Sequence, residues 1–342
     1  MVESKFSTLV DASDPVIWGI IGAAAIARSA IAPAFMLTPN ATMAAIASRE
    51  VARAEAFARD FNIPTAYATY DELINDPDIE AVYIALPNHL HEEWAIRAMN
   101  AGKHVLCEKP LAATAAAAER IVQAADDTDM LCMEAVMYRF HPRIREVEEM
   151  LRSEAIGIPQ LVRGSFCFTM SNFDNYRNDP AMGGGALLDV GSYCINAARW
   201  LLNEEPHTAM AQITLAASGI DETVSGILTF PSGASAHVQC SFASAEHQSL
   251  DIIGSIGSIE LYTPFTAFHN DETSIRLKQG NDFDEILFPP ADPYAVMVAH
   301  FSDCVRDLAE PLLPLTDGVG TLRVIDALRR SATTGRAERI QF

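Results

Sequence analysis

The sequence predicts a two-domain α/β protein, in which a parallel sheet covered by helices precedes a mostly antiparallel sheet. Three observations lead to this fold class. The chain has 342 residues, which is too long for one ordinary core and fits two domains. Up to about residue 135, short apolar runs alternate with helical patterns, as in a parallel sheet covered on both faces. After about residue 157, strands joined by tight turns dominate, so we place the domains at residues 1–135 and 136–342.

The first half is expected to contain five buried strands with helices between them. Apolar runs predict strands at residues 16–21, 44–48, 81–86, 104–107 and 130–135. Apolar residues at helical spacing predict helices at residues 51–61, 70–75, 91–100 and 113–127, and a further helical pattern follows Gly22. Thr114 is the expected N-cap of the alanine-rich helix at 113–127, because its side-chain oxygen can accept a bond from a free backbone N–H.

The second half is expected to be rich in strands, with few helices. Alternating patterns predict strands at residues 161–170, 208–217, 223–230, 234–242, 249–253, 258–262 and 285–288. Residues 230–233 and 279–282 carry the proline, glycine, asparagine and aspartate that are typical of tight turns. Helical spacing predicts helices at residues 187–202, 293–310 and 319–334. These elements favour a mostly antiparallel sheet.

The composition is that of a folded, strongly acidic protein, with 49% hydrophobic and 20% charged residues. The net charge of −21 argues against nucleic acid or an anionic membrane as a partner, and fits a high-salt habitat and an ordinary acidic face equally. Residues 1–15 lack the basic start and apolar run of a leader, and no apolar run reaches membrane-spanning length. Six scattered cysteines show no metal-ligand spacing, so we expect reduced thiols, no metal site and a cytoplasmic location.

A turn rich in glycine and alanine at the end of the first strand is a candidate cofactor site. Gly22, Ala24 and Ala27 form a variant of the dinucleotide-binding fingerprint, in which small residues let backbone N–H groups reach a pyrophosphate. Ala24 replaces the usual second glycine, and the pattern alone fits an alanine-rich helix start equally well. If the turn is such a fingerprint, we expect it to bind the cofactor through Gly22, Ala24, Ala25 and Ile26.

The end of the second strand favours NADP(H) over NAD(H). An NAD(H) site places an acidic residue there to bind the ribose hydroxyls, and a carboxylate repels a 2′-phosphate. This chain has Ser48 and Arg49 instead, a hydroxyl and a guanidinium that suit a phosphate. Arg53, one helical turn further on, offers a second guanidinium. The alternative is a solvated arginine at a helix start.

Two further segments carry candidate acid/base groups. Lys109 lies in Glu108-Lys109-Pro110, directly after the fourth strand, at the sheet edge where ligands bind. Asp189 and Tyr193 follow three glycines and lie four residues apart, on one helix face. We expect the ammonium to lower the pKa of Tyr193, so that the three groups form a proton relay. Each segment alone also fits a surface lysine or a tyrosine packed in the core.

Together these segments resemble the glucose-fructose oxidoreductase / inositol dehydrogenase / rhizopine-catabolism (Gfo/Idh/MocA) oxidoreductase family. The resemblance covers nearly the whole chain, through the turn at Gly22 and residues 85–91, 107–110, 183–193 and 324–331. It implies a Rossmann domain followed by an α/β domain with a large open, predominantly antiparallel sheet, and the C-terminal helix can return to the first domain. Tyr193, where many members carry histidine, is similar to the branch of glucose-fructose oxidoreductase, dihydrodiol dehydrogenases and NADP-dependent xylose dehydrogenases.

The resemblance also implies roles for individual residues. It makes Lys109 catalytic, with Asp189 and Tyr193 completing the catalytic site. Arg177 matches a residue near the substrate pocket, so substrate binding is expected from Lys109, Arg177, Asp189 and Tyr193. The remaining cofactor contacts that it implies are Leu86, Pro87, Asn88, His91, Glu108 and Lys109.

We therefore expect an NADP(H)-dependent oxidoreductase that moves a hydride between the nicotinamide and a CH–OH/C=O carbon of a sugar or related polyol. Alternatives are a sugar–sugar oxidoreductase with tightly bound NADP(H), a dihydrodiol dehydrogenase, and a non-catalytic NADP-sensing regulator on the same fold. Lys109, Asp189 and Tyr193 argue against the regulator, because it would not need them. Residues 223–230 carry apolar side chains on both strand faces, so we expect a homodimer or homotetramer formed through the second-domain sheet.

Overall fold

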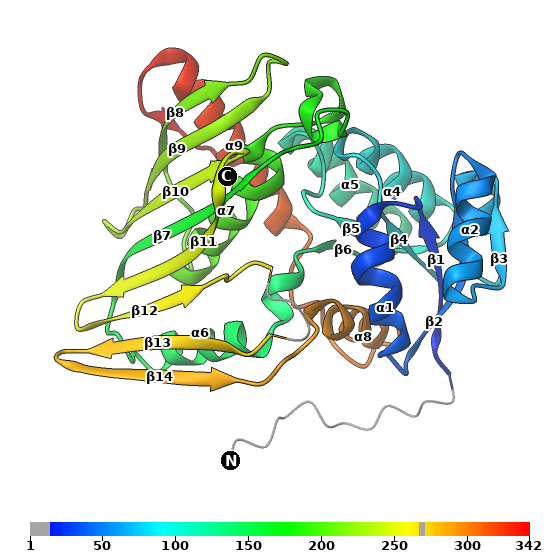
Figure 1. Ribbon diagram of the computed structural model, residues 1–342, viewed down its shortest axis with the longest axis horizontal. Helices are drawn as coiled ribbons and strands as arrows, with labels where there is room; N and C mark the ends of the chain where they lie inside the picture. Colours follow the sequence, from blue (N-terminus) through cyan, green and yellow to red (C-terminus); the bar gives the residue numbers. More distant parts are fainter. Residues whose placement is uncertain (1–13, 267–270) are drawn as a thin grey trace.

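The computed structural model describes residues 14–266 and 271–342 and contains two sheets. Figure 1 shows the first sheet among the blue and cyan elements, beside a larger sheet coloured from green to orange. The N-terminal segment in which we expected no leader lies, up to residue 13, outside the described residues. Within the described residues, no helix is both long enough and apolar enough to cross a membrane.

The first sheet is built from six parallel strands in the order β3-β2-β1-β4-β5-β6. The strands are β1 (Val16–Ile21), β2 (Ala41–Ala47), β3 (Thr65–Tyr67), β4 (Ala81–Ile84), β5 (His104–Glu108) and β6 (Cys132–Ala135). All five predicted strands are present, and the short β3 is an addition. The order reverses between β1 and β4, which are paired, so their carboxyl ends flank a topological switch point. Ligands of open α/β sheets bind at such a crevice.

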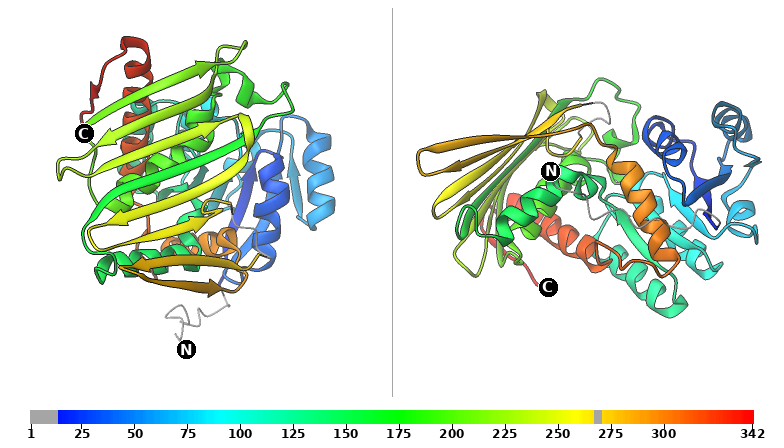
Figure 2. Two further views of the ribbon diagram at one scale, coloured as in Figure 1. Left: turned by 60° about the vertical axis from the view of Figure 1, so that its left-hand side comes forward. Right: turned by 90° about the horizontal axis from the view of Figure 1, so that it is seen from below.

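Helices cover both faces of this sheet (Figure 2). They are α1 (Ala32–Met36), which continues a π-helical turn at Ala27–Ile31, α2 (Val51–Phe61), α3 (Tyr70–Ile74), α4 (His91–Asn100) and α5 (Ala115–Thr128). Thr114 caps α5 as predicted, because its side chain accepts a backbone N–H of the first turn. The helix α8 (Pro293–Val305) also packs here, and Trp18 Nε1 donates to its Ser302 Oγ at 3.1 Å.

The second sheet has nine strands in the order β14-β13-β12-β11-β7-β10-β9-β8-β15. They are β7 (Pro159–Thr169), β8 (Thr208–Leu215), β9 (Asp221–Thr229), β10 (Ser235–Ser241), β11 (Ala243–Gly254), β12 (Gly257–Tyr262), β13 (Thr273–Gln279), β14 (Asp282–Phe288) and β15 (Glu338–Arg339). Only β7 and β10 pair in parallel; the other neighbours are antiparallel. The predicted fold class is therefore confirmed.

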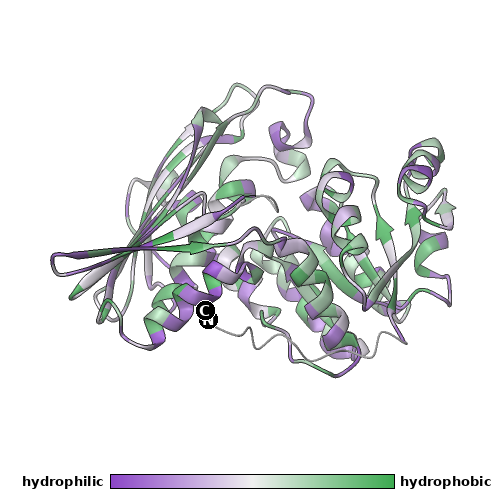
Figure 3. Ribbon diagram, turned by 60° about the horizontal axis from the view of Figure 1, so that its bottom comes forward, coloured by the Kyte–Doolittle hydropathy of each residue, from purple (hydrophilic) through white to green (hydrophobic). Residues whose placement is uncertain are grey.

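Helices α6 (Pro142–Arg152), α7 (Ser192–Leu202) and α9 (Thr316–Thr334) pack on one face of the second sheet (Figure 2). The inward side chains of this sheet, such as Val162, Leu228 and Ile252, are fully buried. None of the described helices covers the opposite face. Hydrophobic and hydrophilic residues are mixed along these strands in Figure 3. On the uncovered face Met210 is 50% and Tyr262 is 73% exposed.

Several elements of the second half differ from the prediction, and the short strand β15 is one that was not predicted. The helix α6 was not predicted, although its buried Ile144, Val147 and Met150 are spaced by three residues, because charged residues surround them. The strand β13 was also missed. The strand β11 begins six residues before the predicted range 249–253, since its first five residues are exposed and show no apolar alternation. In this half Ala243, His247 and Gln248 pair with β7 across a register shift, so the strand forms without an apolar pattern.

Candidate active site

The turn after β1 leaves room for a dinucleotide. Gly22 has a φ of 105°, in the region that favours glycine, and a Cβ atom there would lie 2.5 Å from the Ala85 carbonyl oxygen. The turn therefore packs directly against the end of β4. Ala24, Ala25 and Ile26 follow at the helix start and remain at least partly exposed. The small side chains of the two alanines leave the backbone accessible, which fits a pyrophosphate.

A hydroxyl and two guanidinium groups follow β2, next to this turn. Ser48 is buried directly after the strand, whereas Arg49 and Arg53 are exposed. Arg53 Nη2 donates to the Ala23 carbonyl oxygen at 3.0 Å, so its guanidinium lies across the cofactor turn. Burial raises the pKa of Tyr70, and the charges of Arg49 and Arg53 oppose this shift, so both cations act on the same phenol. These groups fit the 2′-phosphate of NADP(H).

Lys109 follows β5 and reaches the second domain. Its Nζ atom donates to the carbonyl oxygen of Asp189 at 2.8 Å and to the Oδ1 atom of Asp189 at 2.9 Å. The lysine side chain is only 12% exposed. Asp189 lies in a π-helical turn, Leu187–Gly191, that leads into α7. The pair thus joins the edge of the first sheet to the helix that covers the second sheet.

Asp189 is held between two cations. Arg177 Nε donates to its Oδ2 atom at 2.7 Å, on the side opposite Lys109. Burial alone would raise the pKa of Asp189, but Lys109 and Arg177 outweigh burial and hold this pKa well below its usual range. The same carboxylate raises the pKa of Arg177. Asp189 is therefore an anion that orients Lys109 and Arg177.

The glycine triplet at residues 183–185 lets the segment that carries Arg177 approach the helix start. A Cβ atom on Gly184 would lie 2.4 Å from the Arg177 carbonyl oxygen. The next residue, Gly185, donates its backbone N–H to that same oxygen at 3.0 Å. The glycines thus allow the backbone at Arg177 to come close to the triplet, and this places Arg177 next to Asp189.

Tyr193 lies beside Lys109, but its hydroxyl bonds to another residue. Lys109 Nζ is 5.0 Å from the ring centroid, and Tyr193 Oη donates to Met137 Sδ at 3.7 Å. Burial raises the pKa of Tyr193 well above its ordinary value, and the carboxylates of Glu108 and Asp189 raise it further. The expectation of a lowered pKa is therefore wrong for this structure, because burial and the two carboxylates outweigh the nearby cations.

The turn after β4 supplies the other predicted cofactor contacts. Leu86 and Asn88 are buried and Pro87 is partly exposed, at the switch-point edge opposite Gly22. The side chain of His91, which the resemblance also makes a cofactor contact, points into the protein instead. Its ring is fully buried, with Nδ1 2.8 Å from Pro110 O and Nε2 2.8 Å from Leu86 O. Both ring nitrogens thus face backbone carbonyls.

Comparison with known proteins identifies the family. Residues 16–136 match the family described as "Oxidoreductase family, NAD-binding Rossmann fold", and residues 144–260 match the GFO/IDH/MocA C-terminal domain. An uncharacterized oxidoreductase of Rhizobium meliloti is 40% identical over 96% of this chain and 100% of its own length. The chain belongs to the GFO/IDH/MocA oxidoreductase family.

Two further members of the GFO/IDH/MocA family are similar over almost their whole length. D-xylose 1-dehydrogenase (NADP(+)) 2 of Haloferax volcanii is 35% identical, and the match covers 94% of this chain and 99% of that protein. The structure of a 3-ketoreductase of Actinomadura kijaniata, in complex with NADP and TDP-benzene, superposes with a TM-score of 0.88 at 30% identity. That superposition covers 93% of this chain and 98% of the ketoreductase. This chain is therefore an oxidoreductase.

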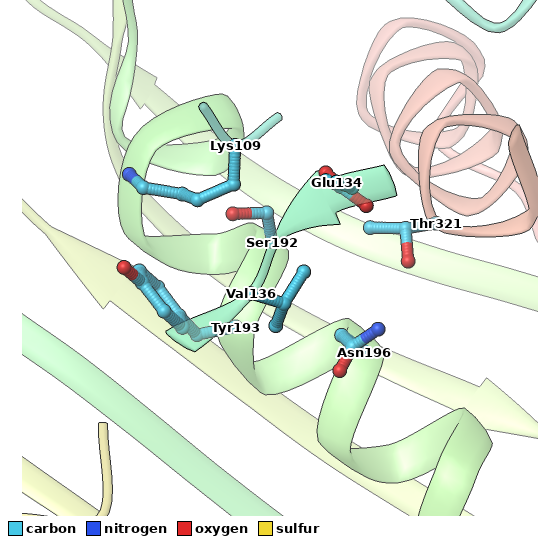
Figure 4. Close-up of a pocket in the computed structure, with 7 residues that line it drawn as sticks. All are labelled: Lys109, Glu134, Val136, Ser192, Tyr193, Asn196 and Thr321. Atoms are coloured by element: carbon cyan, nitrogen blue, oxygen red, sulfur yellow. The ribbon is translucent and has the colours of Figure 1, made fainter. Parts of the chain in front are cut away.

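In this GFO/IDH/MocA oxidoreductase, Glu134 belongs to the site region but was not predicted. A small pocket next to Lys109 is lined by Lys109, Glu134, Val136, Ser192, Tyr193, Asn196 and Thr321 (Figure 4). Glu134 comes from β6, and burial raises its pKa to about 7. The missed signal is a single carboxylate within an apolar, buried strand, where a charge needs a specific partner.

Proposed function

We propose that this protein is an NADP(H)-dependent oxidoreductase that transfers a hydride between the cofactor and a CH–OH/C=O carbon of a sugar or related polyol. The observation that carries the proposal is the group of Lys109, Asp189 and Tyr193 at the carboxyl edge of the Rossmann strands. An ammonium, a carboxylate and a phenol can together transfer a proton at an alcohol oxygen and stabilise its charge. The D-xylose dehydrogenase relative supports a sugar as the substrate.

NADP(H) would lie across the switch point, with its pyrophosphate on the turn after Gly22 and its 2′-phosphate between Ser48, Arg49 and Arg53. Arg53 already lies across that turn through its bond to Ala23. The nicotinamide half would reach the turn at residues 86–88 and the end of β5, next to Glu108 and Lys109. When bound, the nicotinamide supplies or accepts the hydride.

Tyr193 and Lys109 would carry the proton and hold the reacting oxygen. In reduction the neutral phenol of Tyr193 donates its proton to the carbonyl oxygen as the hydride arrives at the carbon. In oxidation the tyrosinate takes the proton of the substrate hydroxyl as the hydride leaves the same carbon. Lys109 donates a hydrogen bond to that oxygen and stabilises its developing negative charge. Asp189 keeps the ammonium in place and Arg177 binds substrate hydroxyls beside it.

The test is a substrate and cofactor screen on the purified protein. Absorbance near 340 nm is recorded with aldoses, inositols and diols, each with NADP+ and with NAD+. We expect aldose oxidation with a higher kcat/KM for NADP+, and Arg49→Asp should reverse the cofactor order by repelling the 2′-phosphate and binding the ribose. Arg59→Asp makes the same charge change at the other, exposed end of α2 and should leave the order unchanged. Equal wild-type efficiency with both cofactors would contradict the cofactor assignment.

We also propose that the protein assembles as a homodimer or homotetramer through the uncovered face of the second sheet. In β9, Val224 and Leu228 point inward and are buried, whereas Ile227 points outward and is 45% exposed. Met210, its neighbour on β8, is 50% exposed on the same face. An apolar area on an open sheet face favours symmetric association.

A further inference from the structure

The Pro110–Leu111 peptide group, one residue after Lys109, is held at both ends by buried ionisable side chains. Its carbonyl oxygen, on Pro110, lies 2.8 Å from His91 Nδ1. Its N–H, on Leu111, donates to Glu134 Oε1 at 2.8 Å. His91 is fully buried and Glu134 is 6% exposed, so neither bond competes with bulk water. His91 comes from α4 and Glu134 from β6, two elements on either side of β5 in the chain.

His91 also connects this peptide to the turn after β4. Its Nε2 atom lies 2.8 Å from the Leu86 carbonyl oxygen. The ring therefore bridges two segments that flank the proposed hydride-transfer site, the turn at Leu86 and the segment at Lys109–Pro110. Carbonyl oxygens only accept hydrogen bonds, so a ring N–H must be the donor in each contact. The neutral ring donates to one carbonyl at a time, and the imidazolium donates to both. Burial of the charged form lowers the pKa of His91, and the two carbonyls oppose this shift.

Neither side chain bonds to the Lys109 ammonium. The hydrogen bonds of that ammonium go to Asp189, and Figure 4 shows the Glu134 carboxylate directed away from it. His91 and Glu134 therefore act on Lys109 through the backbone. The position of the lysine relative to the cofactor matters because a displacement of about 1 Å from the reactive geometry can lower a rate by about 10²-fold.

We propose that His91 and Glu134 are positioning residues, which fix the Pro110–Leu111 peptide and thereby the distance between Lys109 and the turn at residues 86–88. This inference rests on the proposed function, because it assigns that turn to the nicotinamide and Lys109 to the substrate oxygen. The link from His91 to Pro110 sets the lysine, and the link to Leu86 sets the cofactor turn. The two links should therefore affect different kinetic constants.

Two conservative substitutions separate the two links. In His91→Asn the amide nitrogen takes the place of Nδ1, so the bond to Pro110 is kept and the bond to Leu86 is lost. In His91→Gln the amide nitrogen takes the place of Nε2, and the reverse holds. We expect His91→Gln to lower kcat by about 10-fold or more, with little change in the KM for NADP+, because the lysine is displaced. We expect His91→Asn to raise the KM for NADP+ more than it lowers kcat.

Glu134 tests the other end of the same peptide. Glu134→Met removes the acceptor and leaves the Leu111 N–H without its partner, so kcat should fall as in His91→Gln. Glu134→Gln retains an acceptor oxygen, and its kcat should stay close to that of the wild type. His207→Gln, an exposed histidine before β8, is the matched control for the histidine variants and should change neither constant.

The wild type is assayed first, and its failure to oxidise any aldose with NADP+ would overturn the proposed function rather than this inference. With an active wild type, kcat and the KM for NADP+ are measured per folded protein for each variant. A kcat loss in His91→Gln and Glu134→Met, with a KM increase in His91→Asn, supports the two links. Wild-type constants in all variants, or equal changes in His91→Asn and His91→Gln, would overturn the positioning roles.

Discussion

Replacing Glu134 by glutamine should remove a pH dependence from the stability of the protein. The pKa of Glu134 is raised from 4.5 to about 7, because burial and the Asp317 carboxylate together outweigh the opposing effect of the Leu111 N–H. Glutamine cannot titrate, yet it retains an acceptor oxygen for the Leu111 N–H. The comparison of the two proteins therefore isolates the charge from the hydrogen bond.

The size of the effect follows from the pKa difference. Between pH 4.5 and about 7 the folded protein holds a proton on Glu134 that the unfolded chain has released. The free energy of unfolding of the wild type therefore falls as the pH rises through this window, by about 3 kcal/mol in total. An unfolding entropy of about 2.1 cal/mol/K per residue converts this energy into about 4 °C of Tm for 342 residues.

Thermal unfolding of both proteins at several pH values between 4.5 and 8 measures this effect. The Tm of Glu134→Gln should rise relative to the wild type by about 4 °C across that range. Glu55→Gln changes an exposed carboxylate on α2 and should show no such trend. A difference between Glu134→Gln and the wild type that stays constant with pH would refute the reasoning.

Three further predictions concern catalysis and assembly. Tyr193→Phe should lower kcat by about 10²–10⁴-fold and leave the Kd for NADP(H) unchanged. A variant that keeps more than about a third of the wild-type turnover would show that another residue is the acid/base. Burial raises the pKa of Tyr193, so kcat/KM for oxidation should rise with pH around neutrality, whereas kcat/KM for reduction should stay level. If kcat/KM for oxidation does not change with pH, the phenol is not the base. Light scattering should give a multiple of the 37.1 kDa chain mass, and a monomer would contradict assembly.

The fold could be predicted wherever one chain segment carried its own periodic signal. The strands of the first sheet are continuous apolar runs, because both of their faces are buried, and all five were found. The first half of β11 carries polar residues on both faces and takes its place through hydrogen bonds to β7, which no local pattern records. The helix α6 was missed for a similar reason, because charged residues separate the apolar residues of its buried face.

The site shows the same limit. Lys109, Asp189 and Tyr193 lie in segments whose local chemistry is unusual, and the structure brings them together. The contacts of Glu134 and His91 come from residues that are not their chain neighbours: Glu134 binds a backbone N–H 23 positions earlier, and His91 binds a carbonyl 19 positions later. A carboxylate in a buried strand indicates that it has a polar partner. It does not say which one.

The difference between the sequence prediction and the structure that matters most for the mechanism is the protonation state of Tyr193. A lysine near a tyrosine lowers the phenol pKa only if its charge is not already balanced. Here Asp189 binds the ammonium, and burial adds to the effect of the Glu108 and Asp189 carboxylates, so the phenol keeps its proton. A neutral phenol is an acid, ready to protonate a carbonyl oxygen in the reduction direction. In oxidation the same phenol must first lose its proton to serve as the base, which is why we expect kcat/KM for oxidation to rise with pH.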